Sequence, residues 1–283
     1  MTAHTATRPI VVGVESKQQA SIRYALDEAE RQKCGVRIVH AYAIPSTELG
    51  VFNGTEIMDA SEADAQSVLN VAREFVESLG SSVLVEYSAQ IGAPTRVLET
   101  ESREASQMVL GPDDNAWYDR ILVGDVGKRL VGHSHCPIIV VPESWDARED
   151  RRDGVVVAVD GEHESHSSLA FAFAAADLRR SELHVMHVVP ADTTINDAET
   201  HRLFVAETLA GWSAEYPDVN VLTTFIFGEI DESCITATKS ADIVVVGRHQ
   251  NKTLPFSLLR PVTTPIIKEA NCPVAVVPFD ENG

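Results

Sequence analysis

The sequence predicts an α/β fold built twice, with two doubly wound parallel-sheet domains in one chain. The first observation is an internal repeat, because CPIIVVP at residues 136–142 returns as CPVAVVP at residues 272–278. The second is a series of short β-branched runs bounded by Gly, Pro, Asp or Asn, which is typical of strands buried on both faces. The third is that helix-length amphipathic stretches separate these runs, as the alternation of a doubly wound sheet requires.

In the first half, five such runs predict strands at residues 9–14, 36–42, 83–89, 107–110 and 137–141. Between them, SIRYALDEAERQ (21–32) and SEADAQSVLNVAREFVESLG (61–80) have the apolar spacing of amphipathic helices. We expect Ser61 to cap the start of the second helix and Gly80 to end it.

The second half repeats this order, with expected strands at residues 154–159, 183–189, 219–227, 242–246 and 273–277. At the offset of 136 set by the CP heptads, two glycine pairs correspond, Gly92 with Gly228 and Gly111 with Gly247. Nearer the start the offset is larger, and VRIVHAY corresponds to LHVMHVV, so that His40 lies opposite His187. The second half is therefore a shortened copy of the first.

The segment 142–154 is charged and has no periodicity, so we expect the linker there, with a helical extension as the alternative. The predicted domains are residues 1–146 and 150–283. A length of 283 residues agrees with two domains at about 100–200 residues each.

The formal charge of −19 (23 Lys and Arg, 42 Asp and Glu) excludes proteins that bind nucleic acid through phosphate contacts, and it also disfavours anionic membranes. No apolar run approaches the roughly 20 residues that cross a bilayer, and the first residues do not resemble a signal peptide. We therefore expect a cytoplasmic protein with no nucleic-acid and no membrane partner.

The four cysteines are far apart and form no CxxC pair, so we expect reduced, mostly buried thiols. His133, His135 and Cys136 are near one another, but three ligands on one strand approach do not complete a tetrahedral site. We expect no metal.

The order of the elements, the repeated CPxxVVP close and the opening strands PIVVGVES (9–16) and GVVVAVDG (154–161) resemble the universal stress protein family, as a tandem pair over nearly the whole chain. The resemblance implies a five-stranded parallel sheet in each half, of the adenine nucleotide alpha-hydrolase-like type. It also implies that the halves pair through their last strands as an internal pseudo-dimer, and it leaves a homodimer of such pseudo-dimers open.

Nucleotide-binding members of this family carry a loop after the fourth strand that reads Gly, two residues, Gly, nine residues, Gly, and Ser or Thr. An Asp at the end of the first strand holds the nucleoside. In the first half Gly111 and Gly124 match this pattern, whereas Asp114 and Asp125 replace a glycine and the hydroxyl residue, and Glu15 replaces the Asp. Because carboxylates repel a phosphate, we expect this pocket to be degenerate.

The second half keeps Asp160, Gly161 and Gly247, but Gln250, Arg260 and Pro261 replace the remaining loop residues. Basic side chains, Arg248 and Arg260 among them, still favour an anion. The candidate nucleotide-binding residues are therefore Asp160, Gly161, His187, Gly247, Arg248, Gln250 and Arg260. In the following segment, His163, Glu164 and His166 suggest either a polar loop with a serine N-cap or a phosphate contact at a helix N-terminus.

No GxSxG elbow, P-loop or GxGxxG fingerprint occurs, so we expect no catalytic residues and no enzymatic activity. The favoured hypothesis is a non-catalytic stress-response sensor or interaction module with degenerate nucleotide-binding loops, an unknown protein partner and no required cofactor. The alternative is an ATP-binding member that retains a site for an adenine nucleotide in the second domain, with weak hydrolysis.

Overall fold

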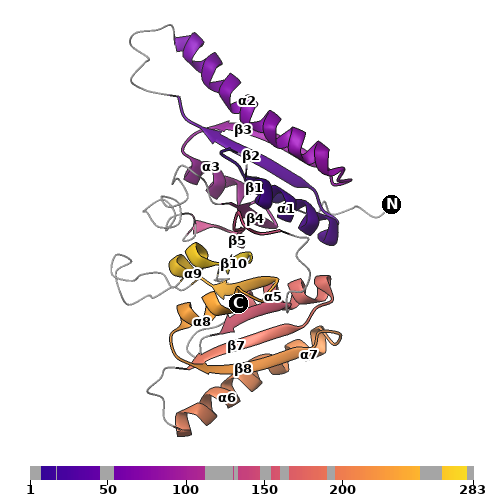
Figure 1. The fold of residues 1–283 in the computed structure, drawn as a ribbon, viewed down its shortest axis with the longest axis vertical. Helices are drawn as coiled ribbons and strands as arrows, with labels where there is room; N and C mark the ends of the chain where they lie inside the picture. The colour runs from indigo at the N-terminus through magenta and orange to yellow at the C-terminus, as the bar shows by residue number, and fades with distance from the viewer. Residues whose placement is uncertain are drawn as a thin grey trace. The chain divides into compact units, whose positions relative to one another are not determined.

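The computed structural model describes residues 8–16, 18–44, 54–111, 130, 133–146, 154–159, 166–189, 195–248 and 263–278. The chain divides into two compact units, Met1–Ala147 and Arg148–Gly283 (Figure 1). Each unit is an α/β structure in which helices pack against a parallel sheet. The predicted fold class is confirmed.

The sheet of unit 1 has the strand order β3-β2-β1-β4-β5, and every described pair in it is parallel. Its strands are β1 (Ile10–Gly13), β2 (Val36–Tyr42), β3 (Val85–Ile91), β4 (Gln107–Leu110) and β5 (Ile138–Val140). Its helices are α1 (Gln19–Gln32), α2 (Gly54–Leu79) and α3 (Pro94–Glu101). The five predicted strands are confirmed, with differences of a few residues at their ends.

Unit 2 repeats this topology in the order β8-β7-β6-β9-β10. Its strands are β6 (Val155–Val159), β7 (Leu183–Val189), β8 (Val221–Phe227), β9 (Ile243–Gly247) and β10 (Val274–Val277). Its helices are α5 (His166–Arg179), α6 (Ile195–Ala210), α7 (Trp212–Glu215), α8 (Ile230–Ala237) and α9 (Thr263–Glu269). The predicted pairing of the two halves through their last strands concerns the relative placement of the units and stays a prediction.

The first strand of each half lies at the centre of its sheet. β1 and β6 each have a parallel neighbour on both sides, and every residue in them is buried. Helices supply the apolar cover, since Leu169, Ala172, Phe173 and Ala176 of α5 follow the helical period and are fully buried. The near-continuous valine and isoleucine runs of the sequence therefore reflect strands that contact protein on all sides.

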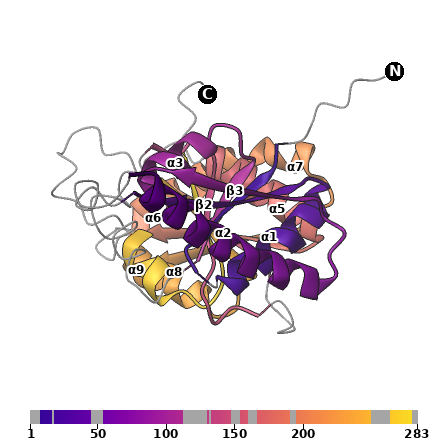
Figure 2. The same ribbon diagram turned by 90° about the horizontal axis from the view of Figure 1, so that it is seen from above.

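The predicted start of α2 is wrong. The helix begins at Gly54 rather than after Ser61, and it lies against β2 and β3 (Figure 1, Figure 2). Ile57 is 8% exposed and continues the buried stripe of Ala65 and Leu69, so the helix gains apolar contact by extending upstream. Ser61 is consequently an interior helical residue rather than a cap.

The start of the predicted linker belongs to unit 1. The backbone N–H of Trp145 donates to Pro142 O at 3.0 Å, which makes a turn at the start of this segment, whereas residues 147–153 lie outside the described residues and the helical alternative stays open there. The Trp145 ring packs edge-on against Tyr24 of α1, with 5.4 Å between ring centroids. Within the described residues, no helix is both long and apolar enough to span a membrane.

Candidate functional site

The carboxyl ends of parallel strands lie at one edge of a sheet, which is where α/β proteins commonly bind ligands. In unit 1 the end of β1 is closed by Gln18. Its side-chain Oε1 accepts hydrogen bonds from the backbone N–H groups of Glu15 and Ser16, both at 2.9 Å, and the residue is 3% exposed. These two amides therefore already have an acceptor from the protein itself.

Gly111 follows β4 and approaches helix α1 closely. A Cβ atom at this position would collide with Oγ of Ser21 and would lie 3.1 Å from Cγ of Gln18. Ser21 is fully buried, and within the described part of the chain neither its Oγ nor Nε2 of Gln18 has a hydrogen-bond partner. Close packing of α1 thus gives Gly111 a structural reason to be glycine, separate from any phosphate contact.

The other residues expected in the first-half pocket can be placed only in part. Glu15 is half-buried in the turn that Gln18 closes. Asp114, Gly124 and Asp125 lie outside the described residues, so the expected degeneracy of this loop stays a prediction.

In unit 2, His187 of β7 contacts the carboxyl end of the central strand β6. This side chain is fully buried, and its Nδ1 lies 3.0 Å from Val159 O at the end of β6. Because a carbonyl oxygen can only accept, Nδ1 carries a hydrogen, and Nε2 lies 2.9 Å from Nδ1 of His201, within hydrogen-bond distance. Both ring nitrogens are bonded to protein, so His187 fixes the end of β6 rather than presenting a nitrogen to a ligand.

The same relationship exists in unit 1, where Nδ1 of His40 donates to Val14 O at 2.8 Å. The sequence alignment of the two halves, which set His40 opposite His187, therefore corresponds to one shared hydrogen bond. His201 has no such precedent in the sequence. It lies on α6, fourteen residues from His187, at a spacing that matches no motif.

The remaining candidates in unit 2 lie at or beyond the ends of β6 and β9. Gly247 is the last residue of β9, and the backbone N–H of the half-buried Arg248 donates to Val277 O at 2.8 Å. The other four candidates, Asp160, Gly161, Gln250 and Arg260, lie outside the described residues, as do His163 and Glu164. The structure therefore brings His187, Gly247 and Arg248 to one edge of the sheet and leaves the full set a proposal.

Two cysteines are unsuited to chemistry at neutral pH. Burial raises the pKa of the Cys136 thiol to about 11 and that of the Cys234 thiol to about 12. Because the thiolate is the reactive and metal-binding form, both side chains stay protonated and inert. Among the residues that the structure describes, no group of three or more His, Cys, Asp or Glu side chains could hold a metal ion.

The model of the universal stress protein family matches residues 6–142 and 152–278, once in each unit. The chain belongs to the universal stress protein family. A universal stress protein of Mycolicibacterium smegmatis is 28% identical to it over 283 residues, which cover 95% of this chain and 96% of that protein. One from Mycobacterium tuberculosis is 26% identical, with 94% and 96% covered.

The crystal structure of a universal stress protein from Archaeoglobus fulgidus superposes with a TM-score of 0.71 at 17% identity, and 98% of each chain is covered. This likeness shows the fold. Family membership, with a domain match in each half and relatives of the same length, makes the chain a tandem universal stress protein and supports a role in the stress response.

Proposed function

We propose that this universal stress protein acts without catalysis, as a sensor or interaction module of the stress response with domains 1–146 and 150–283. The observation that carries the proposal is that the Gln18 side chain caps the carboxyl end of β1 in unit 1. Gln18 occupies the backbone amides of Glu15 and Ser16, two donors that a bound anion could otherwise use. A pocket whose donors are already paired within the protein is a poor nucleotide site.

The electrostatics of the first-half loop support the same proposal. Asp113, Asp114, Asp119 and Asp125 follow Gly111, with Arg120 as the basic residue among them. Each carboxylate near a phosphate costs free energy, about 1 kcal/mol per contact at 4 Å in water and several times more near a protein surface. A triphosphate would therefore need a bridging cation before it could bind here.

A second candidate function is retention of an adenine-nucleotide or other small-anion site in unit 2. The supporting observation is that Arg248 directly follows β9, at the sheet edge where His187 fixes the end of β6. In this proposal Asp160 and Gly161 hold the nucleoside, and Gly247, Arg248, Gln250 and Arg260 attract phosphate. His187 acts as a positioning residue for the strand that leads into Asp160, and any hydrolysis is weak.

Isothermal titration of the full chain with ATP, ADP and AMP, with and without Mg²⁺, tests both proposals. The first proposal predicts no micromolar binding in unit 1, and micromolar binding at both pockets would overturn it. The variants Asp160→Ala and Glu15→Ala are a matched pair, since they truncate corresponding positions in the two units. Affinity that is lost in Asp160→Ala and kept in Glu15→Ala would support the site in unit 2, whereas unchanged affinity in Asp160→Ala would remove it. A phosphate-release assay on the same samples measures hydrolysis.

A further inference from the structure

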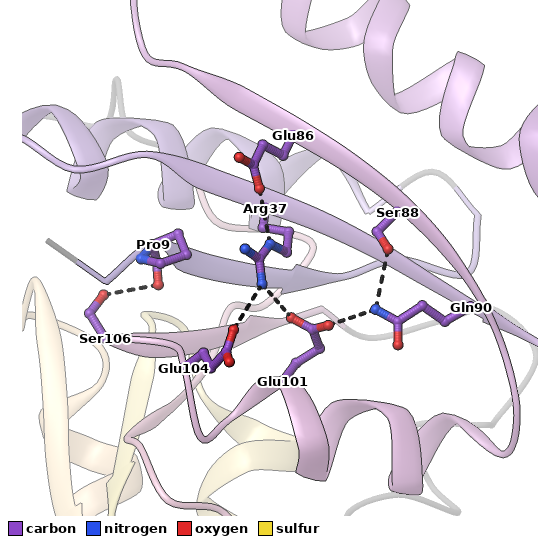
Figure 3. Close-up of polar contacts among 8 residues, drawn as sticks. All are labelled: Pro9, Arg37, Glu86, Ser88, Gln90, Glu101, Glu104 and Ser106. Atoms are coloured by element: carbon purple, nitrogen blue, oxygen red, sulfur yellow. Dashed lines mark hydrogen bonds and ion pairs between the residues drawn. The ribbon is translucent and has the colours of Figure 1, made fainter. Parts of the chain in front are cut away.

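The outermost described strands of the two sheets, β3 and β8, occupy the same place in the repeat but differ in charge. In unit 1, Arg37 of β2 forms ion pairs with Glu86 of β3 at 3.1 Å, with Glu101 at 3.1 Å and with Glu104 at 3.8 Å (Figure 3). Gln90 of β3 donates to the other oxygen of Glu101 at 2.6 Å. Charged side chains on an edge strand discourage another strand from pairing with it.

Arg37 and Glu86 of unit 1 have no charged counterparts at the matching positions of β7 and β8 in unit 2. His184 stands where unit 1 has Arg37, and Leu222 stands where unit 1 has Glu86, because each pair occupies the same register position in its sheet. From Val219 to Gly228 the chain contains no Asp, Glu, Lys or Arg. Leu222 is 42% exposed and Phe227 is 58% exposed, so this uncharged strand faces solvent.

The backbone of β8 has polar groups directed away from β7. The N–H of Leu183 donates to Asn220 O at 2.9 Å, and the N–H of Gly228 donates to Val189 O at 3.2 Å. Even-numbered residues of β8 therefore bond to β7, and by the alternation of a parallel ladder the odd-numbered ones turn both backbone groups outward. These are Val221, Thr223, Phe225 and Phe227, and no described residue pairs with them on that side. Unpaired strand edges of this kind accept an additional strand.

Both ends of this uncharged strand carry exposed acids. Glu215 and Asp218 precede it, and Glu229 and Glu232 follow it. The nearby cation Arg202 lies over the ring of Phe225 and is already ion-paired with Glu199 at 3.3 Å. A segment that lies along β8 would therefore meet an apolar and hydroxyl centre between two acidic ends.

We propose that the outer edge of β8 docks an extended peptide segment of a partner protein, with an uncharged β-branched centre and Lys or Arg at both ends, as an added strand. The proposal rests on the interaction-module part of the proposed function. Charge decides the occupant: in a second copy paired antiparallel, the end of β8 that carries Asp218 in one chain would lie beside the end that carries Glu229 in the other, whereas a basic-ended peptide places opposite charges together. Backbone hydrogen bonds supply affinity, and the flanking charges supply selectivity.

The probe is a fluorescein-labelled peptide, Lys-Lys-Val-Thr-Val-Thr-Val-Lys-Lys, titrated with the full chain and followed by fluorescence anisotropy. We expect saturable binding that weakens as salt rises, and at least about tenfold weaker binding of the same peptide with Glu in place of every Lys. Leu222→Lys places a cation in the uncharged centre of β8, where it repels the Lys-ended probe, and should reduce affinity by at least about tenfold. Glu86→Leu, which changes the net charge by the same amount at the corresponding position of β3, should leave the affinity unchanged.

A second variant guards against loss of fold. Thr223→Pro removes one outward N–H that β7 does not use, so weakened peptide binding with an unchanged circular dichroism spectrum and melting temperature supports the docking edge. The proposal fails if the wild-type chain does not bind the probe, if both peptides bind equally, or if Leu222→Lys binds like wild type. It also fails if sedimentation shows a dimer that Leu222→Lys abolishes, because the occupant would then be a second copy. Nucleotide titrations of Leu222→Lys should match wild type, so the nucleotide proposals stand or fall separately.

Discussion

Nε2 of His187 lies 2.9 Å from Nδ1 of His201, and the other nitrogen of the buried ring donates to Val159. Three elements are therefore joined through one side chain, since His201 belongs to α6, His187 to β7 and Val159 to β6. The hydrogen bond between the two rings requires a lone pair on one of these nitrogens and an N–H on the other. A hydrophobic residue in place of His187 would remove the donor to the Val159 carbonyl and the hydrogen-bond partner of the His201 ring.

His187→Phe should destabilise unit 2 by about 1–3 kcal/mol, because it keeps a ring but leaves the buried Val159 carbonyl unpaired. Native-state hydrogen exchange of amides in β6 and β7 measures this locally, without assuming that both units unfold together. His184→Phe, on the half-exposed part of the same strand, is the control and should change exchange by less than about 0.5 kcal/mol. Equal effects of the two variants would contradict the role given to His187.

Gly111→Ala should destabilise unit 1 by about 1–3 kcal/mol, since the added Cβ collides with Oγ of Ser21. Ser21→Ala alone should be neutral or stabilising by about 1 kcal/mol, because it removes a buried hydroxyl that has no described partner. The double variant should recover much of the loss, so a double-mutant cycle measured by exchange of β1 and β4 amides should give a coupling energy well above zero. Additive effects would mean that the two side chains do not compete for the same space.

Burial raises the pKa of the Asp27 carboxyl above its ordinary value near 3.8, although Arg31 and Arg23 lower it. The folded state therefore holds this proton more tightly than the unfolded state, and the contribution to stability is complete below pH 3.8 and declines as pH rises through the folded pKa. Asp27→Asn should consequently raise the urea midpoint at pH 7 and raise it less at pH 4. Glu30→Gln, an exposed change on the same helix, controls for the loss of a charge. A lower midpoint for Asp27→Asn at pH 7 would mean that the arginines outweigh burial.

Ellman's reagent should modify one thiol of the native chain rapidly. Cys34 is partly exposed, whereas Cys136, Cys234 and Cys272 are 3%, 0% and 0% exposed. Burial also raises the pKa of Cys34 above 9.0, so its rate should keep increasing as pH rises past that value. Cys34→Ser should abolish the fast phase, and the other thiols should react on unfolding. Rapid modification of more than one thiol would show that a buried cysteine becomes accessible.

The strands could be predicted from the sequence because their cause is local. Continuous β-branched runs such as VVVAV mark segments buried on every side, and β6 is found within one residue of its predicted range. The start of α2 could not be predicted in this way. The hydroxyl of Ser61 favours a cap, but the tertiary contact of Ile57 outweighs that local preference.

The candidate site was less accessible to sequence reasoning. The correspondence of His40 and His187 follows from the repeat, and the structure gives it a shared hydrogen bond to the first strand. Gln18 and His201 act through contacts whose spacing matches no motif, so only the folded chain reveals them. The same holds for Gly111, whose sequence context suggests a phosphate loop and whose structure adds the close approach of α1.

The central position of β1 has a consequence for how the chain folds during synthesis. Ile10 pairs with Val36 on one side and with Gln107 on the other, and 97 residues separate the second pair along the chain. At about 5–20 residues per second, the ribosome delivers β4 roughly 5–20 s after β1. The nascent chain can first assemble β1, β2 and β3, and one side of the middle strand then stays exposed until β4 emerges. In unit 2, Val155 likewise remains unpaired with Ile243 until β9 emerges, so each half passes through an interval in which its apolar central strand needs protection from aggregation.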